Sequence, residues 1–381
     1  MADDADGSCQ WLYCTWPGGA PSLTGRCIRL QSRRGVGGSV HRATLREVAV
    51  MAGVHPATAS RALNRQTESL VNSETAARIK KVAAEMGYSP NPIARSLKTS
   101  RSASIGLVIP DLTNPLFPPI VRGVEDVLRT IGYNAWIVNT DNRPDVEKTA
   151  VESFRQRNVE GFVFATAHLK HPLLEELAAA STPMVLVNRR TNGADIPSVT
   201  SDDAAGVAMA MQHLVDLGHT KIVHLAGPQD LSTGVTRRRA FLSSLEELHL
   251  PAEPTRTFIC DEWSEQAGAN AMRTLLDSGP EFTAVLAGND LLALGVYDAL
   301  AERGLRCPDD ISVVGFNDMP FMDKVSPPMT TVRIPHYEIG AEAARLLLEV
   351  LNDPDRHPRS LLLPLTMVVR SSTGPVPAPR A

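Results

Sequence analysis

From about residue 102 onward, short continuous apolar runs alternate with segments whose apolar residues recur at helical spacing. The apolar runs are typical of buried strands and cover 104–109, 135–138, 162–164, 184–187, 221–225, 257–259, 284–286 and 311–314. Helices between such strands indicate parallel sheets that are covered on both faces. The pattern predicts an α/β body with two doubly wound parallel sheets in two lobes, and ligands of such folds bind beyond the carboxyl ends of the strands.

Residues 44 to about 88 follow helical spacing throughout and carry no strand pattern. The first predicted helix follows Thr44, a good capping residue, and stops at Gly53. The second begins at Pro56, and the third runs from Ser73 to Gly87. Three short helices with a tight glycine turn between the first two predict an all-α helix-turn-helix unit over residues 42–89.

Three further segments show neither pattern. Residues 1–41 are rich in Gly, Ser, Pro and Arg, and either are disordered or reflect a start codon assigned too far upstream. Residues 90–101 contain Pro90 and Pro92 and leave room for only one or two helical turns, so we expect a linker that becomes helical when docked. Residues 375–381 form an expected disordered tail without a heptad repeat, which favours a dimer over a tetramer.

Charge is distributed unevenly along the chain. The whole protein has a formal net charge of −4, but residues 44–101 hold nine Lys/Arg against four Asp/Glu, and residues 102–381 hold 24 against 35. A basic module attached to an acidic body suggests that one part meets a polyanion and the other does not. Chance fluctuation in a short window gives the same asymmetry, so charge alone does not decide the matter.

Composition excludes several broad classes of protein. Hydrophobic residues make up 43% of the chain, as in a globular protein. No apolar run approaches the roughly 18 residues that span a bilayer, and the first 40 residues lack the apolar segment of a secretory signal. Five cysteines are too few for a disulfide scaffold. We therefore expect a protein of the reducing cytoplasm.

The motifs of the common enzyme classes are missing. No G-x-G-x-x-G follows the first predicted strand, and neither G-x-x-x-x-G-K-[ST] nor G-x-S-x-G occurs. The ten histidines show no metal-ligand spacing with cysteine. We therefore expect no enzyme activity, no catalytic residues, no metal and no cofactor. An exported sugar-binding protein would share the body fold, but it would need a signal peptide and no helix-turn-helix unit.

A series of motifs runs in order from residue 44 to about 374. They are Thr44–Ala49, Ala52–Val54, Pro56–Asn64, Met86–Leu97, Ile105–Asp111, Asn114–Pro115, Leu217–His219, Leu225–Pro228, Gly288–Asp290, Ala293–Gly295, Val313–Asp318, Leu361–Pro364 and Val368–Thr373. Together they resemble the lactose/galactose repressor (LacI/GalR) family of bacterial transcriptional regulators. The helix-turn-helix motif alone would be a strong signal, and the whole ordered series is very specific.

The resemblance implies a DNA-binding headpiece whose second helix lies in the major groove. The residues that face DNA by position are His55, Pro56, Ala57, Ser60 and Arg61, and those matched to backbone contacts are Thr44, Thr58 and Asn64. Arg61 has a guanidinium suited to guanine or phosphate. Thr44 either caps its helix only or also contacts DNA. His55 stands where the family usually has a capping Ser or Thr, so it either caps poorly or adds a base contact.

Within residues 90–101 the resemblance implies a hinge helix that enters the minor groove. Leu97 matches the family's lever, whose insertion costs base stacking and is offset by a bent duplex that meets more protein. Its neighbours Asn91, Ala94 and Arg95 would line the groove. The alternative is that Leu97 packs on the domain behind it. Two such helices imply a homodimer on a pseudo-palindromic operator.

The resemblance also implies a periplasmic-binding-protein-like body over residues 102–374 that binds an effector and dimerises. Lobe one is expected over about 102–202 and 333–358, and lobe two over about 203–331 and 360–373, with three hinge crossings. The expected effector-binding residues are Leu116, Phe117, Asn188, Arg237, Trp263, Asn289, Asp290 and Asn317. Amides, a guanidinium and an indole suit a sugar. Core packing of Trp263 and helix capping by Asn289 and Asp290 are the alternatives.

Two of these positions depart from the family, since Asn188 and Asn317 stand where relatives often have aspartate. The resemblance predicts a transcriptional regulator, most often a repressor in this family, that a small sugar-like effector controls allosterically. Its expected partners are double-stranded operator DNA, the effector and a second copy of the chain, with no membrane. The expected location is the cytoplasm, with the nucleoid as the site of DNA binding.

Overall fold

The structure is a computed structural model that describes residues 43–64, 67–89, 102–251, 254–278, 280–353 and 357–376. These residues fall into two compact units, the first ending at Pro90 and the second beginning at Asn91. The predicted hinge residues Asn91, Ala94, Arg95 and Leu97, residues 1–41 and most of the tail lie outside the described ranges. Among the described residues, no helix combines the length and the apolar character that crossing a membrane requires.

The first unit is a small bundle of short helices. They are α1 (Leu45–Met51), α2 (Pro56–Ala62), the 3-10 turn η1 (Glu68–Leu70) and α3 (Ser73–Glu85). Gly53 takes the left-handed φ of +62° in the turn between α1 and α2, a conformation that suits glycine because it has no Cβ. The small core consists of Val48, Ala49, Ala52, Ala59, Ala62, Ala76, Ile79 and Ala83. The predicted helix-turn-helix architecture is confirmed.

The second unit contains two six-stranded sheets, one in each lobe. The first has the order β11-β5-β4-β3-β1-β2, and the second β12-β10-β9-β8-β6-β7. The strands of the first are β1 (Ser104–Ile109), β2 (Asn134–Asn139), β3 (Gly161–Phe164), β4 (Met184–Val187), β5 (Ser198–Ser201) and β11 (Ser360–Leu363). Those of the second are β6 (Ile222–Ala226), β7 (Thr257–Ile259), β8 (Ala284–Ala287), β9 (Ser312–Asn317), β10 (Thr330–Arg333) and β12 (Thr366–Val368).

All neighbouring strands in both sheets run parallel except β10 and β12. The helices of lobe one are α5 (Phe117–Thr130), α6 (Pro144–Gln156), α7 (Pro172–Ala179) and α12 (His336–Asn352). Those of lobe two are α8 (Asp203–Asp216), α9 (Ser232–Glu247), α10 (Glu265–Ser278) and α11 (Asp290–Glu302), with the 3-10 turn η2 (Pro254–Arg256). The expectation of two doubly wound parallel sheets is confirmed.

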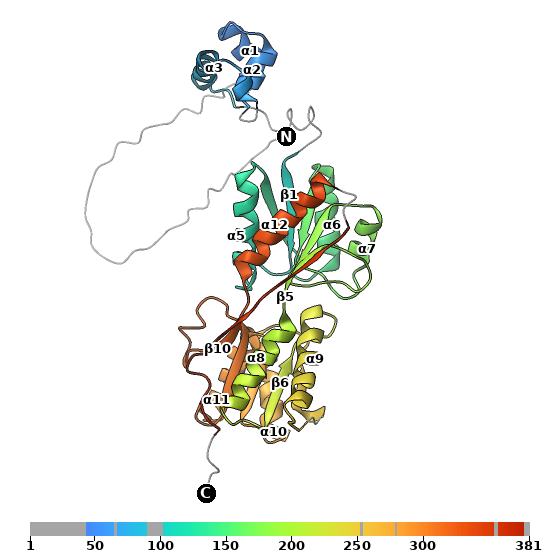
Figure 1. Ribbon diagram of the computed structural model, residues 1–381, viewed down its shortest axis with the longest axis vertical. Helices are drawn as coiled ribbons and strands as arrows, with labels where there is room; N and C mark the ends of the chain where they lie inside the picture. Colours follow the sequence, from blue (N-terminus) through green and yellow to red (C-terminus); the bar gives the residue numbers. More distant parts are fainter. Residues whose placement is uncertain are drawn as a thin grey trace, which may run out of the picture. The chain divides into compact units, whose positions relative to one another are not determined.

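Successive side chains along the strands of lobe one pack into hydrophobic cores on opposite faces of the sheet. Ile105, Leu107 and Ile109 of β1 pack with α5 and α12, whereas Val108 packs with α6 and α7 on the other face. This is the arrangement expected when every strand side chain is buried, because successive side chains point to opposite faces of a sheet. Helices α5 and α12 lie side by side over the first face (Figure 1).

The helix pairs of the body approach each other through glycines. A Cβ added to Gly340 of α12 would lie 1.9 Å from the carbonyl oxygen of Ile120 in α5, and one added to Gly123 of α5 would lie 2.1 Å from the carbonyl oxygen of Tyr337. In lobe two, a Cβ added to Gly295 of α11 would lie 2.0 Å from the carbonyl oxygen of Glu265. Only glycine permits backbones to come this close.

The chain crosses between the lobes after β5, after β10 and after β11. Residues 336–352 return to lobe one as α12, as expected. The expected start of the last lobe-two segment at residue 360 is wrong, because Ser360–Leu363 forms β11 and pairs with β5 in the first sheet. The final crossing therefore lies at Pro364 and Leu365, and β12 is the first element of lobe two after it. Lobe one therefore extends to residue 363, whereas its expected end was about residue 358.

Burial of a histidine in lobe two makes stability depend on pH. His224 of β6 is fully buried, its Nδ1 donates to the carbonyl of Leu286 at 2.8 Å, and its ring stacks on Phe241. Burial, the largest cause, lowers the pKa of His224 to about 4, because the charged form loses its hydration. The folded protein therefore keeps this ring neutral at pH values at which the unfolded chain has already protonated it.

We expect the free energy of unfolding to fall as the pH drops from about 6.5 to about 4. In that window the unfolded chain binds a proton at His224 that the folded protein does not, so the loss is roughly 1.4 kcal/mol per pH unit from this residue. Urea unfolding of wild type and His224→Gln between pH 4 and 7.5 measures it. Equal pH slopes in the two proteins would contradict the prediction.

Candidate functional site

The side chain of Thr44 is fully used in capping α1. Its Oγ1 accepts from the amide N of Glu47 at 3.3 Å, and the Glu47 carboxylate accepts from the amide N of Thr44 at 2.7 Å. This reciprocal pair is a capping box, which satisfies amide groups that the helix itself leaves without partners. The geometry therefore places Thr44 at the helix end as predicted, and a contact with DNA would be additional to the cap.

His55 caps α2 with its ring. Its Nδ1 accepts from the amide N of Ala57 at 3.2 Å, and Pro56 occupies the first helical turn. Of the two alternatives for His55, the structure thus shows a cap, although histidine is an unusual residue for it. The Nδ1 that accepts this bond must be unprotonated, which leaves Nε2 of the exposed ring as its outward donor.

One face of α2 is buried and the other is exposed. Ala59 and Ala62 pack into the small core of the headpiece, whereas His55, Ala57 and Arg61 are exposed on the opposite side. The remaining predicted contacts, Pro56, Thr58, Ser60 and Asn64, are half-buried. Between the exposed rings and chains of His55 and Arg61, the side chains on this face are small, so the backbone of α2 can come close to a surface that it meets.

Ten side chains from both lobes surround one small space in the body. Seven of them were predicted, namely Leu116, Phe117, Asn188, Arg237, Trp263, Asn289 and Asn317; Asn114, Arg189 and Thr233 were not. Most come from segments that directly follow strands or from the first turns of the next helices. The sheets therefore bring these residues together because parallel strands all end at one edge.

Arg237 is the most firmly held member of this group. Its side chain is almost completely buried, with Nε and Nη2 donating to Asp203 Oδ1 at 3.2 and 2.9 Å and Nη1 donating to the carbonyl of Gly288 at 2.6 Å. The guanidinium carbon also lies 3.8 Å from the centre of the Phe316 ring. A cation fixed from three sides is preorganised for a polar ligand, because it needs no rearrangement when the ligand arrives.

Two asparagines at strand ends point unsatisfied oxygens into buried space. Asn188 follows β4 with φ of 62°, and Asn317 ends β9 with φ of 116°. Both side chains are buried, and neither Oδ1 atom has a hydrogen-bond partner among the described residues. Asparagine tolerates the left-handed region better than most residues, but strained backbone and unpaired buried acceptors are concentrated at binding sites.

Trp263 lies flat against glycine backbone. A Cβ added to Gly227 would lie 2.0 Å from the indole, and one added to Gly288 would lie 2.9 Å from it. The ring is therefore part of the wall of lobe two, and its remaining face is half-buried in the lined space. An indole held in this way offers an apolar surface for the C–H face of a sugar.

Asp290 is separated from the other predicted residues. It is fully buried behind the site, where it accepts from Thr331 Oγ1 at 2.6 Å and from the amide N of Met319 at 2.7 Å. Burial, the largest cause, raises the pKa of this carboxyl to about 7. Asp290 does not line the space, whereas its neighbour Asn289 both lines it and caps α11 through Leu292.

The lobes touch each other beside the site. His168 Nδ1 lies 2.9 Å from Asp230 Oδ2, the amide N of Leu169 donates to the carbonyl of Asp230 at 2.9 Å, and the amide N of Arg190 donates to Ser232 Oγ at 3.0 Å. The space that the ten side chains line is only about 20 Å³, room for about one water molecule. A ligand as large as a monosaccharide therefore requires the lobes to separate, and the three crossings provide a hinge for that motion.

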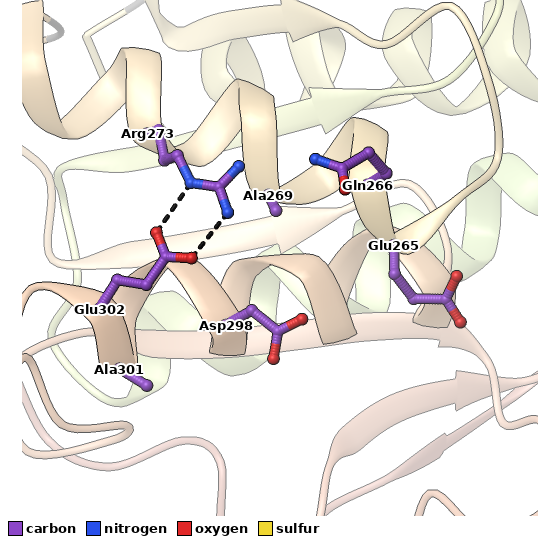
Figure 2. Close-up of a pocket in the computed structure, with 7 residues that line it drawn as sticks. All are labelled: Glu265, Gln266, Ala269, Arg273, Asp298, Ala301 and Glu302. Carbon is purple, nitrogen blue, oxygen red and sulfur yellow. Dashed lines mark hydrogen bonds and ion pairs between the residues drawn. The ribbon is translucent and has the colours of Figure 1, made fainter.

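A larger hollow of about 330 Å³ lies on the outer surface of lobe two, between α10 and α11. Figure 2 shows Arg273 reaching across it to Glu302, with hydrogen bonds of 2.8 and 2.7 Å. The other lining residues are Glu265, Gln266, Ala269, Asp298 and Ala301. Exposed, paired charges of this kind are common on protein surfaces, so the hollow does not compete with the buried site between the lobes.

Comparison with known proteins identifies relatives along nearly the whole chain. Residues 44–91 match the model for bacterial regulatory proteins of the lacI family, and residues 211–373 match that for a periplasmic binding protein-like domain. The ribose operon repressor of Halalkalibacterium halodurans is 33% identical over 87% of this chain and 97% of its own length. The transcriptional repressor CytR of Escherichia coli is 30% identical over 88% and 97% of the two chains.

Two solved structures extend the comparison. The lac repressor dimer bound to operator and an anti-inducer has a TM-score of 0.78 and 28% identity, covering 88% of this chain and all of its own. A LacI-family regulator from Enterococcus faecium with bound ribose has a TM-score of 0.62 and 30% identity, covering 71% and 99%. The likeness thus includes both the headpiece and the two-lobed body.

Proposed function

The chain belongs to the LacI family of bacterial regulatory proteins, and from that premise we propose that it is a sequence-specific DNA-binding repressor whose operator affinity a small effector controls. The observation that carries the proposal is the coexistence, in one chain, of a basic helix-turn-helix headpiece and a buried polar site between two hinged lobes. The relatives described above are named as transcriptional regulators, which speaks against an enzyme.

For DNA binding we propose that the exposed face of α2 enters the major groove. Arg61 is the residue on this face best suited to guanine or phosphate, and His55, Ala57 and Ser60 complete the close approach. Thr44, Pro56, Thr58 and Asn64 lie at positions from which helix ends and side chains can reach the phosphate backbone. Because few of these side chains make strong base contacts, affinity should fall steeply with salt concentration.

For the effector we propose a sugar or sugar derivative. The support is chemical: the unpaired oxygens of Asn188 and Asn317 accept from hydroxyl groups, and Arg237 donates to them. Trp263 and Phe117 supply apolar surfaces for the C–H faces of a ring. The relatives point in the same direction, since one is named as a ribose operon repressor and another was solved with ribose.

The proposed mechanism is a shift between two states of a homodimer. An effector that binds one arrangement of the lobes better than the other changes the relative orientation of the two lobe-one regions in the dimer, and with it the geometry of the paired hinge segments. Operator affinity then differs between the states by the effector's differential binding energy. We place this regulator in the cytoplasm, bound to operators of the nucleoid.

The hinge segment provides the test of DNA binding. Replacing Leu97 with alanine should weaken binding to the operator tenfold or more, about 1.4 kcal/mol, because the side chain that wedges between base pairs is lost. Leu70→Ala in η1 is the matched control, since Leu70 is 72% exposed and lies outside the face of α2. The operator is first found by genome-wide footprinting with and without candidate sugars, and affinities are then measured on the footprinted fragment.

Equal operator affinity of wild type and Leu97→Ala would reject the lever role while leaving the headpiece assignment in place. Absence of any preferred genomic fragment, with or without sugars, would reject the proposed function as a whole. Effector-induced thermal stabilisation should be unchanged in both variants, since neither residue lines the site of the body.

A further inference from the structure

The site between the lobes carries an unbalanced positive charge. Among its ten lining residues there are two guanidinium groups, Arg189 and Arg237, and no carboxylate. Asp203 neutralises Arg237 directly, with its Oδ1 2.9 Å from Nη2. Among the described residues no carboxylate is hydrogen-bonded to Arg189 in this way, so the lining retains about one positive charge without a directly bonded counter-charge.

Arg189 is buried without hydrogen-bond partners for most of its head group. Its side chain is 6% exposed, and its Nε and Nη1 atoms have no acceptor among the described residues. Burial, the largest cause, lowers the pKa of Arg189 to about 10, which still leaves it charged at neutral pH. Asp230 attracts it from a distance, but that carboxylate is 65% exposed, pairs with His168 and is screened by solvent.

An unpaired cation in a buried site is costly unless a ligand completes it. Removing a guanidinium from water is energetically unfavourable, and an opposite charge in hydrogen-bond contact offsets much of that cost. A neutral sugar supplies only hydroxyl oxygens to such a group. The asparagines at positions 188 and 317 provide acceptors for hydroxyl groups but no negative charge.

Resting on the proposed function, we propose that the effector is a sugar derivative with a negatively charged group, a carboxylate or a phosphate, that lies against Arg189. The hydroxyl groups of the sugar donate to the free oxygens of Asn188 and Asn317. Trp263 covers one face of the carbon skeleton. The class of effector is thus set by Arg189, and the site as a whole selects a small polyhydroxylated anion.

Matched pairs of sugars test the charge requirement in the full-length protein. Isothermal titration calorimetry and thermal shift are measured with D-glucose and D-glucuronate, D-galactose and D-galacturonate, D-ribose and D-ribonate, and the 5-phosphate of ribose and 6-phosphate of glucose. At least one anion should bind tenfold or more tightly than its neutral counterpart, and its affinity should fall as NaCl is raised. The sugar acids and the sugar phosphates are separate arms that identify the source of the charge.

Variants of adjacent arginines localise the effect. Arg189→Gln should reduce the affinity for the preferred anion at least tenfold, whereas Arg190→Gln should leave it unchanged, because Arg190 is exposed, does not line the space and bonds to Ser232 of lobe two through its backbone amide. The Arg189→Gln protein should melt no lower than wild type, since it loses a buried unpaired charge. Asn188→Asp adds a carboxylate to the lining. It should weaken binding of the anion and leave the affinity for the neutral sugar unchanged.

Three outcomes would overturn the inference: neutral sugars binding as tightly as their acids and phosphates, no anion in the panel binding, or Arg189→Gln binding the anion like wild type. The proposed function is judged separately by operator binding. If the protein binds a specific operator and a neutral sugar alters that binding, the proposed function stands and the charge requirement fails. If no specific operator is found, the proposed function itself fails.

Discussion

Replacing Arg237 with alanine should abolish effector-induced thermal stabilisation and lower the free energy of unfolding by about 3–5 kcal/mol. The stability loss arises because Asp203, itself buried, loses the partner that holds Nε and Nη2 against its Oδ1. The carbonyl of Gly288 also loses its donor, Nη1. Binding is lost because the substitution removes the one guanidinium that is fixed in place toward the lined space.

The pH dependence of this variant provides an internal check. Burial already raises the pKa of Asp203 even with Arg237 present. Without the arginine, the positive charge that stabilises the carboxylate is lost, and the pKa of Asp203 should rise further. Lowering the pH from 7 toward 5 should therefore recover part of the lost stability, as the carboxyl takes up a proton in the folded state. Urea unfolding of wild type and Arg237→Ala at both pH values measures this recovery as a smaller stability difference between the two proteins at pH 5 than at pH 7.

Two controls separate these effects from general damage to α9. Arg239→Ala, on the exposed side of the same helix, should leave both stability and effector binding near wild type. Asp203→Asn in the Arg237→Ala background should restore stability without restoring effector binding. If Arg237→Ala keeps the wild-type effector shift, the ligand role of this residue is wrong.

Replacing Gly340 with alanine should destabilise the body by about 3 kcal/mol, at the upper end of the range for overpacking. The added methyl group would lie 1.9 Å from the carbonyl oxygen of Ile120, which belongs to the backbone of α5 and cannot rotate away. Helices α5 and α12 would have to move apart along their whole contact. Thermal unfolding monitored by circular dichroism measures the shift.

Gly374→Ala is the matched control for that substitution. Its added Cβ would lie 3.4 Å from the Pro308 ring, an ordinary van der Waals contact, so its stability should stay within about 0.5 kcal/mol of wild type. The double variant Gly123→Ala/Gly340→Ala should be less destabilised than the sum of the two single variants, since one displacement of α5 relieves both contacts. A melting temperature for Gly340→Ala equal to that of Gly374→Ala would contradict the close-packing argument.

The predicted strands were those whose residues are mostly apolar. Eight such runs correspond to β1, β2, β3, β4, β6, β7, β8 and β9. The four remaining strands are short and rich in Ser and Thr or alternate in burial, such as Ser198–Ser201 and Ser360–Leu363. Their pairing depends on segments that are distant in the sequence, so local pattern does not reveal them.

The same reasoning explains the error at residue 360. Ser360–Leu363 pairs with β5, a segment about 160 residues earlier. The local sequence of Ser360–Leu363 does not indicate that pairing. The crossing at Pro364 and Leu365 was therefore placed several residues too early. Strand–helix alternation predicts how many layers a body has more reliably than it predicts where a returning chain changes sheets.

Most of the residues that line the proposed effector site were predictable because they follow strand ends. Asp290 was the exception in one direction: it begins α11, but its carboxylate turns toward Thr331 and Met319. Arg189 is the opposite case, because it lines the space but was not predicted. In extended backbone it would point away from its neighbour Asn188, but the left-handed φ of Asn188 lets both residues line one space. Sequence alone does not reveal that dihedral angle.

The late return of the chain to lobe one has a consequence for protein synthesis. Lobe one acquires α12 and β11 only from residues 336–363, after all five strands of lobe two from β6 to β10 have been made. A chain emerging from the ribosome can complete its headpiece early, but one face of its first sheet stays only partly covered, by α5, until α12 is made at about nine-tenths of translation. Truncated products that end before residue 336 should therefore be natural targets for chaperones and proteases.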